Sequence, residues 1–385
     1  MHFQKFLPLV LACGVASAIG CQLVASPFLT ARQKAPAERP VPKPQTNPLA
    51  SKEFDAYRLE VSRKFASDDF AWIDSEAREL RLTKQRLPGG SFKLRPLYRA
   101  LEDPPEPNAT AKQWEDHFAR LERWVKQDPL SLTARVGLGS AWTNYAWEAR
   151  GDNAGDVNES DMEAFAERLV TAAKILNEAS SLDERCPEWY VAALRVGIGQ
   201  HWDRAAFDRT FLAAVELDPN YYYVYQAKAI YLLPRWYGQT GESERFAEES
   251  ARNVGGPQGD IIFFAIYSRL LALKDKAFVA TLHQVRGRLL DAFGSIDKLY
   301  GSTPHVLNEV CYFSYGSIEY QRVAELFNRL GENYDPTVWG SKENFDFNRK
   351  SALDAAKLNR GKRSSAGATN LKRRNYPQIT PITQI

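Results

Sequence analysis

The chain has 385 residues, of which 44% are hydrophobic and 25% charged, proportions that exclude wholesale disorder and suffice for one large or two ordinary domains. The net charge of +3 is uneven, because residues 1–52 hold six basic residues and one acid, and residues 350–385 hold eight basic residues and one acid. The body between these ends is therefore acidic, and nucleic-acid binding by it is not expected.

Residues 1–30 have the form of an export signal. Lys5 is followed by an apolar run from Phe6 to Ala25, the pattern that the secretion machinery recognises. Cleavage near Ala16–Ala18 would release a soluble protein, whereas Ala18–Cys21 (AIGC) resembles a bacterial lipoprotein box in which Cys21 is lipidated. About 20 apolar residues would also just span a bilayer as an uncleaved anchor. Each alternative places the body outside the cytoplasm, in the cell envelope or facing the periplasm.

Residues 31–51 predict a semi-rigid linker, because such a segment cannot bury apolar surface and its prolines favour extended geometry. These are Pro36, Pro40, Pro42, Pro44 and Pro48. A spacer directly after a membrane segment favours tethering over release. At the other end, residues 351–385 predict a basic, disordered tail, with attraction to anionic lipid or an anionic wall polymer as the functional alternative.

The region between the linker and the tail, residues 52–350, predicts one all-α domain. Apolar residues recur at helical spacing over residues 54–65, 70–80, 114–125, 136–149, 165–176, 278–293 and 323–330. Ser160–Glu163 has the form of a capping box, and Pro187 and Pro304 stand where first-turn prolines belong. No strand-turn-strand pattern interrupts these stripes.

One segment indicates a helical repeat. Phe211 and the small Ala214, followed by Leu217–Pro219, resemble the second half of a tetratricopeptide repeat, in which the proline ends a helix. Asp-Pro recurs at residues 128–129 and 335–336, but insertions at 151–159 and 234–241 break any fixed period. The expected architecture is an irregular tetratricopeptide-like α-α superhelix.

Four runs are similar to the bacterial domain of unknown function family numbered 4034. They are Leu87–Leu94 (LPGGSFKL), Thr133–Val136 (TARV), Tyr145–Gly151 (YAWEARG) and Tyr231–Gly238 (YLLPRWYG). The resemblance covers roughly residues 70–330. It implies a helical, tetratricopeptide-like domain, and it brings no established activity, cofactor or functional residue.

Motifs for catalysis, metals or cofactors are not found in the sequence. None of the five histidines pairs with another at metal-ligand spacing, and the sequence has no HExxH, P-loop or GxSxG motif. We therefore predict no catalytic residue, metal or cofactor. Cys186 and Cys311 could form a disulfide in an oxidising compartment, but two free, buried thiols are the preferred interpretation.

Arginines beside aromatic residues are the best binding candidates, since this combination is typical of interaction hot spots. The residues are Trp142, Tyr145, Arg150, Trp202, Arg235, Trp236 and Tyr237. On one concave face they could hold an extended peptide or a glycan. The alternative is an aromatic core in which the arginines contact helix C-terminal carbonyls.

These observations predict an exported, membrane-tethered scaffold that binds a protein or peptide partner and contacts the membrane through its N-terminus. One alternative is an enzyme acting on a cell-envelope polymer in an all-α groove, around carboxylates such as Glu148 or Asp203. That alternative requires two acids facing one cleft. A structural envelope lipoprotein is the third possibility.

Overall fold

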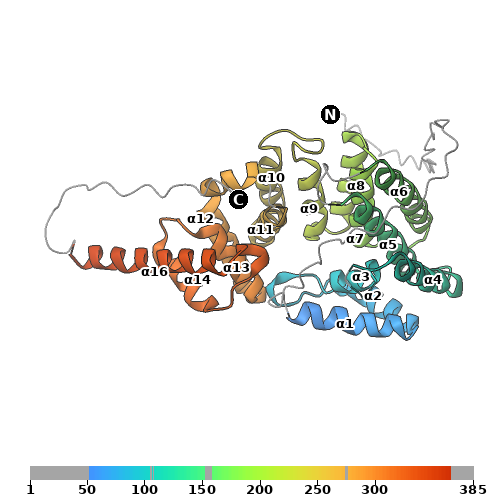
Figure 1. Cartoon of the computed structure of the whole chain (residues 1–385), viewed down its shortest axis with the longest axis horizontal. Helices are drawn as coiled ribbons and strands as arrows, with labels where there is room; N and C mark the ends of the chain where they lie inside the picture. Colours follow the sequence, from blue (N-terminus) through green and yellow to red (C-terminus); the bar gives the residue numbers. More distant parts are fainter. Residues whose placement is uncertain (1–51, 105, 107, 152–157, 274–275, 366–385) are drawn as a thin grey trace, which may run out of the picture. The chain divides into compact units, whose positions relative to one another are not determined.

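The computed structural model describes residues 52–104, 106, 108–151, 158–273 and 276–365. Within these ranges the chain forms sixteen α-helices and one short 3-10 helix, η1, and its only β pairing is an isolated bridge between Arg86 and Phe92. The predicted all-α class is confirmed. Figure 1 shows the helices in chain order, from α1 in blue to α16 in red.

The elements have the following bounds: α1 (Lys52–Ala66), α2 (Phe70–Thr83), η1 (Pro88–Gly90), α3 (Leu94–Glu102), α4 (Ala111–Gln127), α5 (Leu132–Arg150), α6 (Glu159–Ser180), α7 (Pro187–Gly199), α8 (Arg204–Leu217), α9 (Tyr222–Tyr231), α10 (Glu242–Val254), α11 (Gly256–Ala272), α12 (Lys276–Tyr300), α13 (Pro304–Ser314), α14 (Tyr320–Leu330), α15 (Pro336–Trp339) and α16 (Lys342–Ser365).

The helices pack in two series. From α4 to α14 each helix contacts the next in the chain, and in addition α1, α3, α5, α7, α9 and α11 contact one another in that order. Helix pairs whose first members stack side by side give this pattern. The odd-numbered helices α1 to α11 therefore form a continuous row (Figure 1), which we call the odd row.

The segment that resembles a tetratricopeptide repeat in sequence forms a close contact between three helices. The buried ring of Phe211 on α8 contacts Tyr225 on α9 and Phe246 on α10, with ring centroids 5.3 and 5.6 Å apart. Ala214 is buried, and α8 ends at Leu217, directly before Asp218 and Pro219. Large rings from one helix pair thus fill the seam with the next.

Two predicted helix starts are confirmed and one is wrong. Pro187 and Pro304 occupy the first turns of α7 and α13. Helix α6, however, is capped by Asn158 and not by Ser160, because the Asn158 side chain accepts a hydrogen bond from the Asp161 N–H at 2.9 Å. The helix thus begins at Glu159, inside the segment that the sequence analysis took as an insertion.

The last helix extends beyond the predicted end of the domain, whereas the two cysteines are as predicted. The expected end of the domain at residue 350 lies inside α16, which continues to Ser365, and the rest of the basic tail lies outside the described residues. Cys186 and Cys311 are both free and buried, as preferred. The export segment, Cys21 and the linker lie outside the described residues. No helix in the described ranges is long and apolar enough to cross a bilayer.

Gly259 allows the close approach of α10 and α11. A Cβ atom at this position would lie 2.2 Å from the backbone oxygen of Ala251, whereas a Cβ atom at Gly294 on α12 would meet nothing within 4 Å. Both glycines lie inside helices, and Gly294 is exposed. Replacing each glycine by alanine changes helix propensity in the same way, but only the change at Gly259 disturbs packing.

We predict that Gly259→Ala lowers the free energy of unfolding by about 1–3 kcal/mol, because the methyl group forces α10 and α11 apart. Gly294→Ala should raise it by roughly 0.5–1 kcal/mol, because alanine restricts the unfolded chain and favours the helix. Urea titration followed by circular dichroism measures both. Equal shifts of the same sign would contradict the packing role of Gly259.

Candidate functional site

A cavity of about 550 Å³ lies along the odd row, within the size range of ligand pockets. Helices α3, α7, α9 and α11 supply most of its wall, and α1, η1, α12 and α13 complete it. The lining positions follow helical spacing, which places them on one face of each helix. On α11 they are Ile261, Phe264, Ala265, Ser268 and Arg269.

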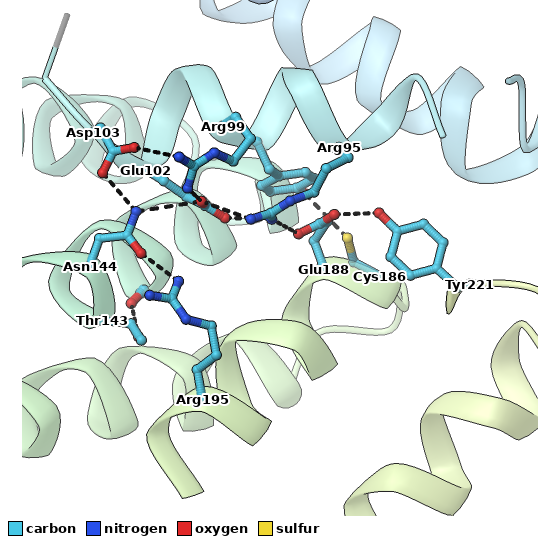
Figure 2. A network of polar contacts seen from close by, with 12 residues as sticks. Arg95, Arg99, Glu102, Asp103, Thr143, Asn144, Cys186, Glu188, Arg195 and Tyr221 are labelled. Atoms are coloured by element: carbon cyan, nitrogen blue, oxygen red, sulfur yellow. Dashed lines mark hydrogen bonds and ion pairs between the residues drawn. The ribbon is translucent and has the colours of Figure 1, made fainter. Parts of the chain in front are cut away.

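One end of the cavity is built around Arg95 of α3. Its guanidinium binds both carboxylate oxygens of Glu102, at 2.7 and 3.1 Å, and also contacts Glu188 of α7. Glu188 in turn accepts a hydrogen bond from the hydroxyl of Tyr221, next to α9. Figure 2 shows Arg95 between the two carboxylates. This polar cluster, which we call the Arg95 cluster, joins α3, α7 and the start of α9.

Asn144 of α5 extends the Arg95 cluster towards α7. Its amide nitrogen donates to Asp103 at 2.7 Å, and its amide oxygen accepts a hydrogen bond from Arg195 of α7. Arg99 contacts Glu102 at 2.9 Å and Asp103 at 3.4 Å. The carboxylates of Glu102 and Asp103 are thus already bound by Arg95, Arg99 and Asn144.

The two buried glutamates of the Arg95 cluster have opposite pKa shifts. Burial alone would raise the pKa of Glu102, but the charges of Arg95 and Arg99 lower it to about 2. Burial raises the pKa of Glu188 to about 7, because the Arg95 charge offsets the loss of solvation only in part and the Glu102 charge adds to the rise. Glu188 therefore titrates near neutral pH, while Glu102 stays ionised.

Arg195 differs from Arg95 and Arg99 in having no ion-pair partner among the described carboxylates. Arg195 donates a hydrogen bond to the amide oxygen of Asn144, its only side-chain partner among the described residues. Arg195 also lines the cavity. Burial, together with the positive charges of Arg95, Arg99 and Arg269, lowers the pKa of Arg195 to about 10 against the attraction of Glu102. It nevertheless remains protonated at neutral pH.

A second polar group lines the cavity from α13 and α11. His305 of α13 contacts Asp335 at 2.8 Å and Glu309 at 3.5 Å, and Ser268 of α11 donates to Glu309. Burial alone would lower the pKa of His305, but Glu309 and Asp335 raise it to about 10. His305 is therefore cationic at neutral pH, and Glu309 is bound by a cation and a hydroxyl.

Aromatic and apolar side chains also line the cavity. Tyr222, Tyr223 and Ile230 line the wall from α9, and Ile261 and Phe264 line it from α11. The Tyr222 hydroxyl donates to the Tyr223 hydroxyl at 3.1 Å. The lining of the cavity thus combines two polar groups, one of them rich in arginine, with apolar and aromatic side chains.

The binding residues predicted from the sequence lie elsewhere, since none of the seven lines this cavity. Arg150 and Trp236 do come together, with the guanidinium carbon 4.7 Å from the ring centroid, and Trp236 meets Trp147 edge to face at 5.5 Å. Arg235 is exposed. Arg150 therefore covers an aromatic pair, as in the alternative interpretation of an aromatic core.

The remaining predicted residues form two further packing groups. Trp142 stacks on Phe118 at 4.1 Å, and the ring of Tyr145 is covered by Arg168 at 3.3 Å. Trp202 donates from its indole N–H to Gln200 at 3.3 Å. Tyr237 shares a hydrogen bond of 2.9 Å with His201. The five aromatic residues of the set are each half-buried, so they do not form one exposed rim.

Neither acid named for the enzyme alternative lines the cavity. Asp203 caps α8, where its side chain accepts a hydrogen bond from the Ala206 N–H at 2.7 Å, and burial raises the pKa of Glu148 on α5. Glu309 is the only acid among the described residues that line the cavity. Across the same ranges, no group of three His, Cys, Asp or Glu side chains could hold a metal ion.

Arg95, Glu188 and Arg195 were not identified from the sequence. The sequence pattern that could have identified them is a charged residue within an otherwise apolar helix. Apart from Glu188 and Arg195, α7 has no charged residue. On α3, Arg95, Arg99 and Glu102 lie at i, i+4 and i+7, the spacing of one helix face. Searching for charges at this spacing would have found them, whereas searching for arginines adjacent to aromatics in sequence did not.

Comparisons with known proteins identify no relative. No family model matches the chain, and no curated protein or solved structure is significantly similar to it. The resemblance to the family numbered 4034 therefore stays a prediction.

The raised pKa of Glu188 predicts a pH-dependent stability. Because this pKa is raised from 4.5 to about 7 on folding, the contribution of Glu188 is fully present below pH 4.5 and is lost as the pH rises through 7. Glu188→Gln imitates the neutral form, with its amide able to accept from Arg95 and donate to Tyr221. Relative to this variant, the wild type should lose on the order of 1–3 kcal/mol between pH 5 and pH 8.

Urea titrations at several pH values measure this difference. Glu325→Gln makes the same chemical change at an exposed position on α14 and serves as the control, with a pH profile parallel to that of the wild type. Parallel profiles for wild type and Glu188→Gln would contradict the assignment.

Proposed function

We propose that the protein is an exported, membrane-tethered scaffold whose helical body binds an extended peptide segment of a partner protein in the cavity of the odd row. The observation that carries this proposal is the lining of that cavity. Residues from eight elements line about 550 Å³ and combine guanidinium donors with apolar side chains and tyrosines. Such a surface can hold a peptide backbone and an apolar side chain together.

The arrangement of donors favours a peptide. Arg99, Arg195 and Gln226 line the cavity, and their N–H groups suit the carbonyl and carboxylate oxygens of a peptide. Their positions are fixed by contacts within the protein, since Gln226 donates to the Ala265 backbone oxygen at 2.8 Å and Arg195 to Asn144. A preorganised wall lowers the entropic cost of binding.

Affinity selection tests peptide binding. The purified full-length protein is incubated with a pool of random linear dodecapeptides, and retained peptides are identified by mass spectrometry. Ile230 lines the cavity and is half-buried, so Ile230→Trp should fill the space and weaken binding of the enriched peptides by about tenfold or more, on the order of one lost hot spot.

Leu212→Trp is the matched control, because Leu212 is 61% exposed on α8 and does not line the cavity. It should bind the enriched peptides as the wild type does. Thermal melting confirms that both variants remain folded. If no peptide is enriched, or if Ile230→Trp binds as tightly as Leu212→Trp, the cavity is not a peptide site.

The tether rests on the N-terminal sequence, and fractionation of a bacterial host tests it. The full-length chain should remain in carbonate-washed membranes and be accessible to protease from outside the cytoplasm. Transfer of Cys21→Ser to the soluble fraction would assign the tether to a lipid on Cys21, and retention would assign it to the apolar segment. A soluble, protease-protected full-length chain would contradict export.

A further inference from the structure

We infer that the arginine end of the cavity binds a carboxylate group of the bound peptide, with Arg195 as the residue that contacts it. This inference rests on the proposed function and adds the chemistry of the partner. The carboxylate can belong to an Asp or Glu side chain or to a peptide C-terminus, and the experiment below separates the two sources.

Arg195 is the one guanidinium in the Arg95 cluster whose charge is not matched by a carboxylate in contact with it. Arg95 binds Glu102 and Glu188, and Arg99 binds Glu102 and Asp103. Arg195 binds only the neutral amide of Asn144 among the side chains described. An uncompensated charge held in a half-enclosed wall costs stability, so an anion that reaches it gains a strong interaction.

Asn144 fixes the direction of Arg195. Because the amide nitrogen of Asn144 donates to Asp103, its oxygen must face Arg195, and this oxygen occupies only part of a guanidinium that carries five N–H donors. Arg195 also lines the cavity, and no other side chain in the described ranges binds its guanidinium. In Figure 2 the Arg195 side chain points from α7 towards Asn144 and the carboxylates of α3.

The charge balance favours a carboxylate over a phosphate. Within the Arg95 cluster only Arg195 lacks a contacting carboxylate, and Glu102 lies close enough to act on the pKa of Arg195. A phosphate monoester carries nearly two negative charges at pH 7 and would be repelled by Glu102 and Asp103. A carboxylate carries a single charge, and its planar oxygens match the guanidinium fork.

The apolar wall next to Arg195 fits the rest of such a peptide. Val191 and Ile198 line the cavity from the same face of α7, one turn to either side of Arg195, and Tyr223 lines it from α9. A carboxylate at Arg195 would therefore place neighbouring peptide atoms against apolar and aromatic side chains. We expect acidic peptides with apolar neighbours to be enriched.

The test uses four synthetic versions of the most enriched dodecapeptide, with its acidic side chain kept or changed to the amide, and with its C-terminus free or amidated. Fluorescence anisotropy measures each affinity for the full-length protein. The version that keeps the recognised carboxylate should bind about tenfold or more tightly than its neutral counterpart, as expected for a charge-assisted bond. If changing the acidic side chain to its amide weakens binding, the recognised carboxylate belongs to that side chain. If amidating the C-terminus weakens binding, it belongs to the C-terminus.

Arg195→Gln should lose the preference, and Arg195→Lys should keep most of it because the charge is retained. Arg209→Gln is the matched control, since it removes the same charge from an exposed position on α8 away from the cavity. Thermal melting shows whether each variant is folded, and Arg195→Lys still tests the inference if Arg195→Gln unfolds.

The outcomes separate the two proposals. If Ile230→Trp blocks binding but acidic and neutral peptides bind wild type equally, or if Arg195→Gln keeps the preference, the carboxylate inference is wrong and peptide binding stands. If Ile230→Trp has no effect, the cavity is not the peptide site and both proposals fail.

Discussion

The buried contact between Arg95 and the two glutamates, Glu102 and Glu188, links α3 to α7 across the row of helices. Moving such charges out of water is costly, and the structure offsets this cost only if every partner is in place. Both oxygens of Glu102 bind the guanidinium of Arg95. The Tyr221 hydroxyl donates a hydrogen bond to the carboxylate of Glu188. Helices α3 and α7 therefore have few alternative alignments, and the same contact fixes the start of α9. The cavity wall follows from this geometry.

The Arg95 cluster also explains how an arginine without an ion pair can be held nearby. Glu102 and Asp103 do not contact Arg195 directly but orient Asn144, whose oxygen then faces the guanidinium. Glu102 stabilises the cation at a distance, and among the described side chains only Asn144 binds the guanidinium. Arg95 and Arg99 are thus neutralised by carboxylates, whereas Arg195 in the same cluster is held by an amide.

Much of the fold could be predicted from the sequence, because apolar periodicity and terminal prolines report local structure directly. Helix α3 was missed because it is only nine residues long and contains Pro96, and α9, α10 and α11 were missed as well. The site was missed for a different reason. Successive residues on a helix point about 100° apart, so an arginine next to an aromatic in sequence rarely shares its face. The residues that meet in the cavity come from separate helices, and only tertiary packing brings them together.

The place of Arg195 in the apolar helix α7 favours a binding role for this residue over a purely structural role. The helix is otherwise apolar apart from Glu188, and an apolar side chain at 195 would pack against Val191 and Ile198 without the cost of desolvating a charge. The other two arginines of the Arg95 cluster, Arg95 and Arg99, are matched by carboxylates. Arg195 instead lines the cavity with its charge unmatched. A fold that retains this charge where a hydrophobic residue would be more stable gives up stability at the place where a ligand can restore it.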